Sequence, residues 1–226
     1  MSFARLCATA LLALAAPLSV AAAAHSEPEP VAEYRLPDGL WEVPVADPGS
    51  FDLIIAYAFG NRIPAGADPA RTVGAPGPVN EELAAAVVRA RGDRDIPVYA
   101  QIEIAEVLTA KYGLTGVVSI DPRRNPDGTL VYLSTLGVAE QVADLRGAAA
   151  ATDVAGVVAF GDHLWRATYS TAATGFDAYA PAGVAMPDRY DPESGQPWTT
   201  GPEKYLPVDY LGRAQLLQST GFRGFR

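Results

Sequence analysis

Blocks of apolar residues alternate with amphipathic stretches along the chain, and this pattern predicts strands that are each followed by a helix. Residues 51–60, 96–100, 117–120 and 154–160 are apolar runs rich in β-branched residues, which is typical of strands buried on both faces. The stretch after each run has apolar residues at helical spacing. Four strand–helix units in series predict an α/β fold with a doubly wound, mainly parallel sheet of the Rossmann-like type.

Residues at the helix ends refine this prediction. Asn80 is suited to cap the first helix, and Gly92 is suited to end it. The second helix is predicted over residues 103–112. Ser134 or Thr135 is expected to cap the third helix, because a hydroxyl can accept a hydrogen bond from an unpaired amide at a helix start.

Outside the four units the pattern is weaker. Residues 40–45 could form a short edge strand, although Pro44 cannot donate a ladder hydrogen bond, and residues 176–179 are expected to add an outer strand. Residues 181–207 are rich in Pro, Gly, Asp and aromatic side chains, which predicts a long ordered loop. A final helix is expected to run through Val208, Leu211, Leu216 and Leu217.

The start of the chain resembles a secretory signal peptide. Arg5 precedes an apolar stretch over residues 6–20, and four alanines follow it. The alternative is an uncleaved anchor, but the stretch is shorter than the roughly 20 residues of a membrane-spanning helix. We therefore expect a signal peptide at 1–24, a flexible lead-in at 25–50 and a single α/β domain at 51–226, in a secreted or periplasmic protein of the cell envelope.

Composition narrows the possible chemistry. Cys7 is the only cysteine and lies in the leader, so the mature chain would have no disulfide, thiol nucleophile or zinc–thiolate site. A net charge of −9 argues against nucleic-acid binding. There is no phosphate-binding Gly-rich motif and only one histidine beyond the lead-in, so no metal site is expected and no cofactor is indicated. The expected partner is a small-molecule ligand, without a stable membrane anchor after cleavage.

The strongest candidate for a functional residue is His163, at the turn after the fourth strand. Ligands of open α/β sheets bind at the carboxyl ends of the strands, where this imidazole could transfer protons. The alternative is a structural histidine. Asp162 could orient His163 or cap the next helix. Arg166 could bind a carboxylate or phosphate, or form an ion pair with Glu103 or Asp121.

Other polar residues follow the remaining strands. Asn61 and Arg62 come after the first strand and are expected to contact the ligand on positional grounds. Ser134 and Thr135 would form an anion site at a helix start, although capping explains them equally well. Glu103 is a candidate base or partner of His163.

Together these positions resemble the YdcF/SanA-like family, a Rossmann-like domain family of largely unknown function. The resemblance spans roughly residues 51–179, and its most specific element is His163 followed by Arg166-Ala167. It departs from the family at residues 59–62 and 100–102, where glycine-rich turns are expected. The resemblance implies a role in the cell envelope. The matching positions are Asp52, Glu103, Asp121, Ser134, Thr135 and residues 162–167.

Three functional hypotheses follow. The first is an exported YdcF-like protein that binds a small anionic or nucleotide-like ligand and is open to catalysis, with His163 moving protons and Arg62 and Arg166 holding negative charge. The second is a non-enzymatic binding or scaffold domain. The third is a metal-independent hydrolase that uses Ser134 or Thr135 with His163, which requires these side chains to meet.

Overall fold

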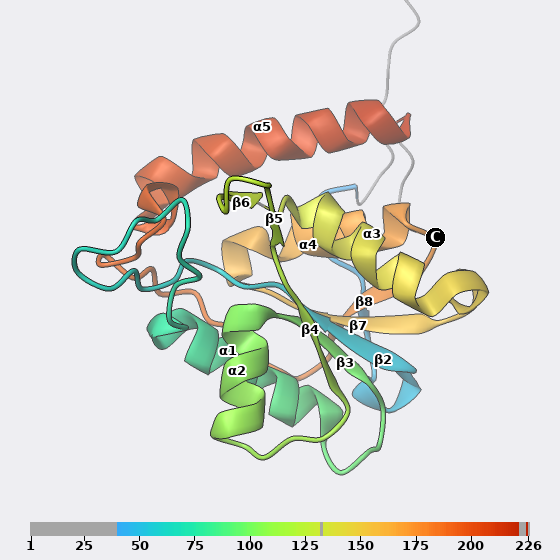
Figure 1. Cartoon of the computed structure of the whole chain (residues 1–226). Coiled ribbons are helices and arrows are strands. Elements are labelled where there is room, and N and C mark those ends of the chain that lie inside the picture. Colours follow the sequence, from blue (N-terminus) through green and yellow to red (C-terminus); the bar gives the residue numbers. More distant parts are fainter. Residues whose placement is uncertain (1–39, 132, 222–224, 226) are drawn as a thin grey trace, which may run out of the picture. The chain divides into compact units, whose positions relative to one another are not determined.

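Six parallel strands form one sheet between two layers of helices within the described residues, which are 40–131, 133–221 and 225 of the computed structural model (Figure 1). These residues belong to a unit that spans Leu36–Arg226. The other unit, Met1–Arg35, lies outside the described residues, as does the expected signal peptide. None of the helices in the described ranges is long and apolar enough to cross a membrane.

The sheet is doubly wound, as predicted. Its strand order is β1-β8-β7-β2-β3-β4, so the chain runs outward from β2 to β4, restarts beside β2 at β7 and runs outward the other way. A short antiparallel hairpin of β5 and β6 follows β4. The strands are β1 (Val45–Ala46), β2 (Leu53–Ala56), β3 (Val98–Gln101), β4 (Val117–Ile120), β5 (Arg123–Arg124), β6 (Leu130–Val131), β7 (Val154–Val158) and β8 (Asp177–Pro181).

Each face of the sheet is covered by its own pair of helices. Helices α1 (Gly77–Arg91) and α2 (Ile102–Ala110) pack on one face, and α3 (Thr135–Arg146) and α4 (Leu164–Ala173) pack on the other. Side chains of β2 alternate between the two cores, which explains why this strand is apolar throughout. Helix α5 (Pro202–Thr220) packs against α4.

One glycine allows close packing at the centre of the sheet. A Cβ atom on Gly156 of β7 would lie 2.4 Å from a ring carbon of Phe51, which is closer than any real contact. The Phe51 ring therefore lies directly against the β7 backbone, and a larger residue at position 156 would displace it.

The first helix begins earlier than predicted. It starts at Gly77, and Asn80 is a fully buried residue inside it instead of its cap. The Asn80 side chain accepts a hydrogen bond from Phe59 N at 2.9 Å and donates to Gly60 O at 2.8 Å. It thus fixes the turn that leaves β2, because it satisfies backbone groups that would otherwise be buried without partners.

The domain is also longer at its start than predicted, and the C-terminal loop is shorter. Leu40 is buried and β1 pairs with β8, so residues 40–50 are not a lead-in. Helix α5 begins at Pro202 and contains Pro207, which had been assigned to the loop. Val208 and Leu211 are exposed, contrary to the expected apolar face, whereas Leu216 and Leu217 are buried as expected.

Candidate functional site

The carboxyl ends of β2 and β7 lie next to each other where the winding of the sheet reverses, and two neighbouring hollows open at this edge. One is a polar pocket of about 40 Å³, and the other is a largely apolar groove of about 410 Å³. Such a switch point is the usual ligand site of doubly wound sheets. The two hollows share the lining residues Gln101, Glu103, Leu133, Gln196 and Trp198.

His163 forms the inner wall of the polar pocket. It lies in a short turn between β7 and α4 and is only 6% exposed. Its Nδ1 is 2.6 Å from the Tyr205 hydroxyl, and its Nε2 is 3.4 Å from the Thr135 hydroxyl. The imidazole therefore bridges the start of α3 and the start of α5.

A buried carboxylate holds the arginine of this pocket. Arg166 donates from Nε to Asp209 at 2.7 Å, from Nη1 to the Thr135 hydroxyl at 3.0 Å and from Nη2 to the Tyr205 hydroxyl at 3.0 Å. Arg213 donates to the other oxygen of Asp209 at 2.5 Å. Asp209 is fully buried, so the two guanidinium groups are what makes its charge tolerable. The polar groups of the pocket are thus largely satisfied by one another.

The surroundings of His163 and Asp209 determine the protonation states of these two side chains. Burial, together with the charge of Arg166, lowers the pKa of His163 to about 4. Burial opposes the charge of Asp209, but hydrogen bonds and charges from His163 and Arg166 outweigh it and hold the Asp209 pKa well below its usual range. At neutral pH, His163 is therefore neutral and Asp209 is ionised.

Neutral His163 allows two arrangements of protons. In the first, the Tyr205 hydroxyl donates to Nδ1, and the proton of the imidazole is on Nε2 and faces Thr135. In the second, Nδ1 donates to Tyr205, whose own proton goes to Asp209 at 3.2 Å. The second arrangement leaves Nε2 free to accept the Thr135 proton, which is the geometry of a nucleophile with its base.

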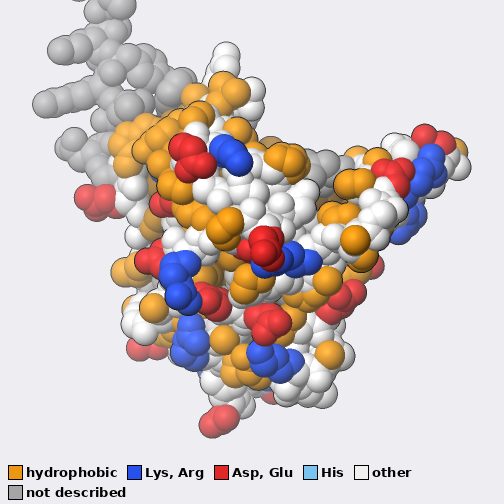
Figure 2. All heavy atoms as spheres, turned by 90° about the vertical axis from the view of Figure 1, so that its left-hand side faces the viewer, with side chains coloured by type: hydrophobic (Ala, Val, Ile, Leu, Met, Phe, Trp, Pro, Cys, Tyr) orange, Lys and Arg blue, Asp and Glu red, His pale blue; other side chains and the backbone are white. Residues whose placement is uncertain are grey.

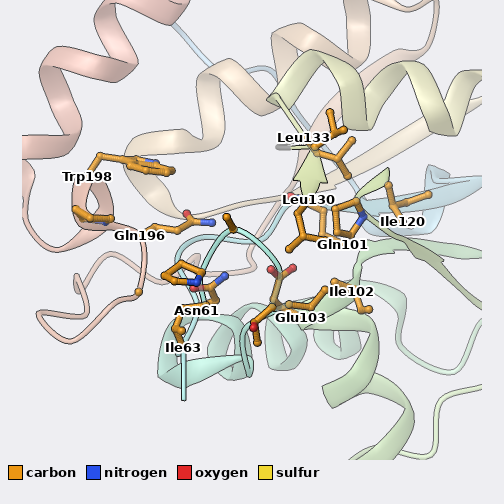
Figure 3. A pocket seen from close by; sticks show the side chains of 18 residues that line it. Asn61, Ile63, Gln101, Ile102, Glu103, Ile120, Leu130, Leu133, Gln196 and Trp198 are labelled. Carbon is orange, nitrogen blue, oxygen red and sulfur yellow. The ribbon is translucent and has the colours of Figure 1, made fainter. Parts of the chain in front are cut away.

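The groove is the larger of the two hollows, and its walls come mostly from loops. Figure 3 shows Glu103 pointing from the start of α2 into the space between Asn61 and the aliphatic side chains of Leu130 and Leu133. Glu103 is the only charged residue among the described residues that line the groove. Its remaining walls are formed by Ile63, Pro69, Ala70, Thr72, Val73, Gln101, Ile102, Ile120, Pro122, Val131, Gly195, Gln196, Pro197 and Trp198.

The carboxylate of Glu103 is in an unfavourable place for a negative charge. Burial raises its pKa, a hydrogen bond with the Asn61 side chain counteracts part of this rise, and the nearby charges of Glu106 and Asp121 raise the pKa further. The two nearby charges that raise the Glu103 pKa are thus both negative, in contrast to the paired charges around Asp209.

The structure brings some of the predicted site residues together. Thr135, His163, Arg166 and Glu103 all line the polar pocket, and Asn61 lines the groove beside Glu103. Of the two alternatives for Arg166, the ion pair with Glu103 or Asp121 is wrong, because Arg166 pairs with Asp209 on α5.

Four other predicted residues point elsewhere. Arg62 pairs with Asp191 and contacts Glu193, outside the two hollows. Ser134 is an exposed cap that accepts from Gly137 N at 3.0 Å, and Asp121 is exposed and accepts from the Ser119 hydroxyl. The expectation that Asp162 caps α4 or orients His163 is wrong, because its carboxylate accepts from the Tyr190 hydroxyl at 2.5 Å.

Sequence reasoning did not identify Tyr205 and Asp209 as parts of the site. They are four positions apart on α5, a spacing that places two side chains on one face of a helix. That signal was hidden because Pro207 lies between them and suggested a loop. Gln101 was also missed, although its side chain accepts from Ala58 N at 2.9 Å and thereby fixes the exit of β2.

The surface around the hollows has mixed charge. Figure 2 shows acidic and basic side chains interspersed with hydrophobic ones on the side where the loops after β2 and β8 project. Within the part of the chain that the structure describes, no group of three His, Cys, Asp or Glu side chains could hold a metal ion.

The fold and the two hollows define the chain as a doubly wound α/β protein with a cleft at its switch point. Comparison with protein-family models, curated proteins and solved structures gives no match. The functional proposals therefore rest on the geometry of the groove and the polar pocket.

Proposed function

We propose that this chain is an exported small-molecule-binding protein of the YdcF-like type, with its ligand in the groove and the ligand's polar end toward the polar pocket. The observation that carries the proposal is that the groove of about 410 Å³ and the polar pocket share five lining residues at the switch point of the sheet. The role in the cell envelope rests on the resemblance to the family and on the leader-like start of the chain.

The lining indicates what kind of molecule fits. Arg62 and Arg166 are both held by carboxylates, so neither offers a free positive charge to a small inorganic anion. Aliphatic side chains, Trp198 and the amides of Gln101 and Gln196 make up much of the rest. These walls favour a ligand with an apolar or heteroaromatic body, which includes nucleotide-like molecules, over a simple anion.

A neutral fluorescent probe tests this proposal. N-Phenyl-1-naphthylamine brightens in apolar surroundings, and we expect saturable binding to the full chain. Leu133→Arg places a charge where the two hollows meet and should weaken this binding at least tenfold. Val208→Arg introduces the same residue at an exposed apolar position on α5 and should leave binding unchanged. Equal binding by both variants would contradict the proposal.

A second candidate function is hydrolysis, favoured by the 3.4 Å contact between the Thr135 hydroxyl and His163 Nε2. In that reaction the Thr135 oxygen bonds to the carbonyl carbon of an ester while Nε2 takes its proton. The alcohol then leaves with that proton, and water releases the acid from Thr135 in a second, equivalent step. Arg166 donates from Nη1 to the Thr135 oxygen, and this hydrogen bond favours removal of the hydroxyl proton.

Hydrolysis of p-nitrophenyl acetate distinguishes the two functions. If the chain is a hydrolase, Thr135→Val should lower the rate at least a hundredfold, because the nucleophile is lost. Thr135→Ser should retain activity, and Ser134→Ala should too, because Ser134 only caps the helix. A wild-type rate no higher than that of Thr135→Val would rule out this reaction and leave binding as the function.

A further inference from the structure

We propose that the groove selects ligands that carry a positively charged amine beside their apolar body, and that the Glu103 carboxylate binds this amine. This inference rests on the proposed function, because it assigns a ligand class to the same groove. It goes further in naming the charge of the ligand, which is opposite in sign to the anion expected from the sequence.

The first argument is the composition of the groove. Glu103 points into it (Figure 3) and is its only charged lining residue within the described ranges. A partly buried carboxylate in an apolar pocket gains most from a partner of opposite charge, because water solvates it poorly. An ammonium group on a ligand would supply that charge together with three hydrogen-bond donors.

The second argument is that neighbouring residues do not neutralise Glu103. The charges of Glu106 and Asp121, which are both acidic, raise the pKa of Glu103 further. Arg166, which lines the polar pocket together with Glu103, is held by Asp209. The local potential at Glu103 is therefore negative, and it favours cations.

The third argument is that the position of Glu103 is fixed before any ligand binds. Its hydrogen-bond partner Asn61 lies between two glycines. A Cβ on Gly74 would lie 2.6 Å from the Asn61 Cγ, and a Cβ on Gly195 would lie 2.9 Å from its Oδ1. The close packing against the two glycines restrains the Asn61 side chain beside the Glu103 carboxylate.

The aromatic wall adds to the preference for a cation. Trp198 lines both hollows, and its side chain is 36% exposed. An indole face attracts an ammonium group that lies within about 6 Å of it. An amine with an apolar tail could therefore contact Glu103 through its charge and contact Leu130 and Leu133 through its tail.

Three ligands with the same body test the proposal. These are 4-phenylbutylamine, 4-phenylbutan-1-ol and 4-phenylbutyrate, titrated against the full chain by calorimetry. We expect the amine to bind at least tenfold more tightly than the alcohol, and the acid to bind most weakly. Glu103→Gln should remove the preference for the amine while leaving the affinity for the alcohol within twofold.

The matched control is Glu140→Gln, which removes the same charge from an exposed position on α3, outside the groove. It should keep the preference for the amine. If the alcohol binds in a Leu133-dependent way but the amine binds no better, the groove is a ligand site and the choice of a cation is wrong. If none of the three compounds binds and the naphthylamine probe is not bound either, the proposed function fails together with this inference.

Discussion

The two hollows of the site differ in how their charges are satisfied. In the polar pocket, Asp209 accepts hydrogen bonds from Arg166, Arg213 and Tyr205, and His163 lies between Tyr205 and Thr135. In the groove, Glu103 has a hydrogen bond with Asn61 and acidic neighbours. The polar pocket is richer in residues that resemble catalytic groups, yet its side chains are mostly occupied by each other.

This difference shows that residue type alone does not locate function. A histidine, an arginine and an aspartate close together suggest a catalytic centre, but the hydrogen bonds of Arg166 also link α4 to α3 and to α5. A single carboxylate without a cationic partner draws less attention in a sequence. In the proposed function it is nevertheless the group that binds the charge of the ligand.

The largest change in stability is expected when Asp209 is replaced. Replacing Asp209 with Asn leaves Arg166 and Arg213 facing each other without a counter-charge, and should lower the free energy of unfolding by about 3–5 kcal/mol. Urea denaturation followed by circular dichroism measures this change. Asp188→Asn, at an exposed carboxylate, is the control. A loss below about 1 kcal/mol would mean that the network does not hold the helices together.

The next effect is a dependence of stability on pH. The folded-state pKa of His163, about 4, lies below the ordinary value of 6.5, so the unfolded chain takes up the proton first. Its contribution is therefore complete above about pH 6.5 and is lost as the pH falls toward 4. We expect the free energy of unfolding to drop by about 2 kcal/mol between pH 7.5 and 5.

The His163→Gln variant tests whether His163 causes this dependence of stability on pH. In His163→Gln the drop between pH 7.5 and 5 should be smaller by about the same 2 kcal/mol. The chain has two histidines, and His25→Gln serves as the comparison. A slope that persists in His163→Gln and disappears in His25→Gln would contradict the buried, neutral state of His163.

The smallest change in stability is expected for Glu103 in the groove. Its replacement should stabilise the fold, whereas replacement of Asp209 should destabilise it. Burial raises the pKa of Glu103, so its ionised form destabilises the fold above that pKa, and the penalty disappears as the pH falls through it. Glu103→Gln should therefore raise the free energy of unfolding at pH 7, by less than about 1 kcal/mol. A clear loss of stability would show instead that Glu103 has a structural partner, and would remove its contrast with Asp209.

Much of the fold was predictable because the strands are buried on both faces. Leu53 and Ile55 of β2 enter one core while Ile54 and Ala56 enter the other, and such a strand appears in the sequence as an unbroken apolar run. The start of α1 was not predictable, because Asn80 resembles a cap but is used to fix a distant turn. The start of helix α5 was predicted too late in the chain, because Pro207 suggested a loop but lies inside the helix.

The site was predictable only where the sheet itself dictates position. His163, Thr135 and Glu103 follow three different strands, and the carboxyl ends of parallel strands lie at one edge of the sheet, so their proximity follows from topology. Tyr205 and Asp209 come from a helix that is not part of a strand–helix unit. The position of that helix over the pocket depends on its packing against α4, and the local sequence pattern does not predict this packing.

The pairing of β1 with β8 affects how readily the molecule associates with other copies of itself. Ala180 and Ala182 donate backbone hydrogen bonds to Pro44 and Ala46, and Trp165 donates from its indole to Leu40. Without residues 40–46, the outer edge of β8 would present unpaired amides and carbonyls to other molecules, and such edges are templates for aggregation. This short stretch therefore protects the sheet from self-association, although it precedes the four strand–helix units and contributes no group to the cleft.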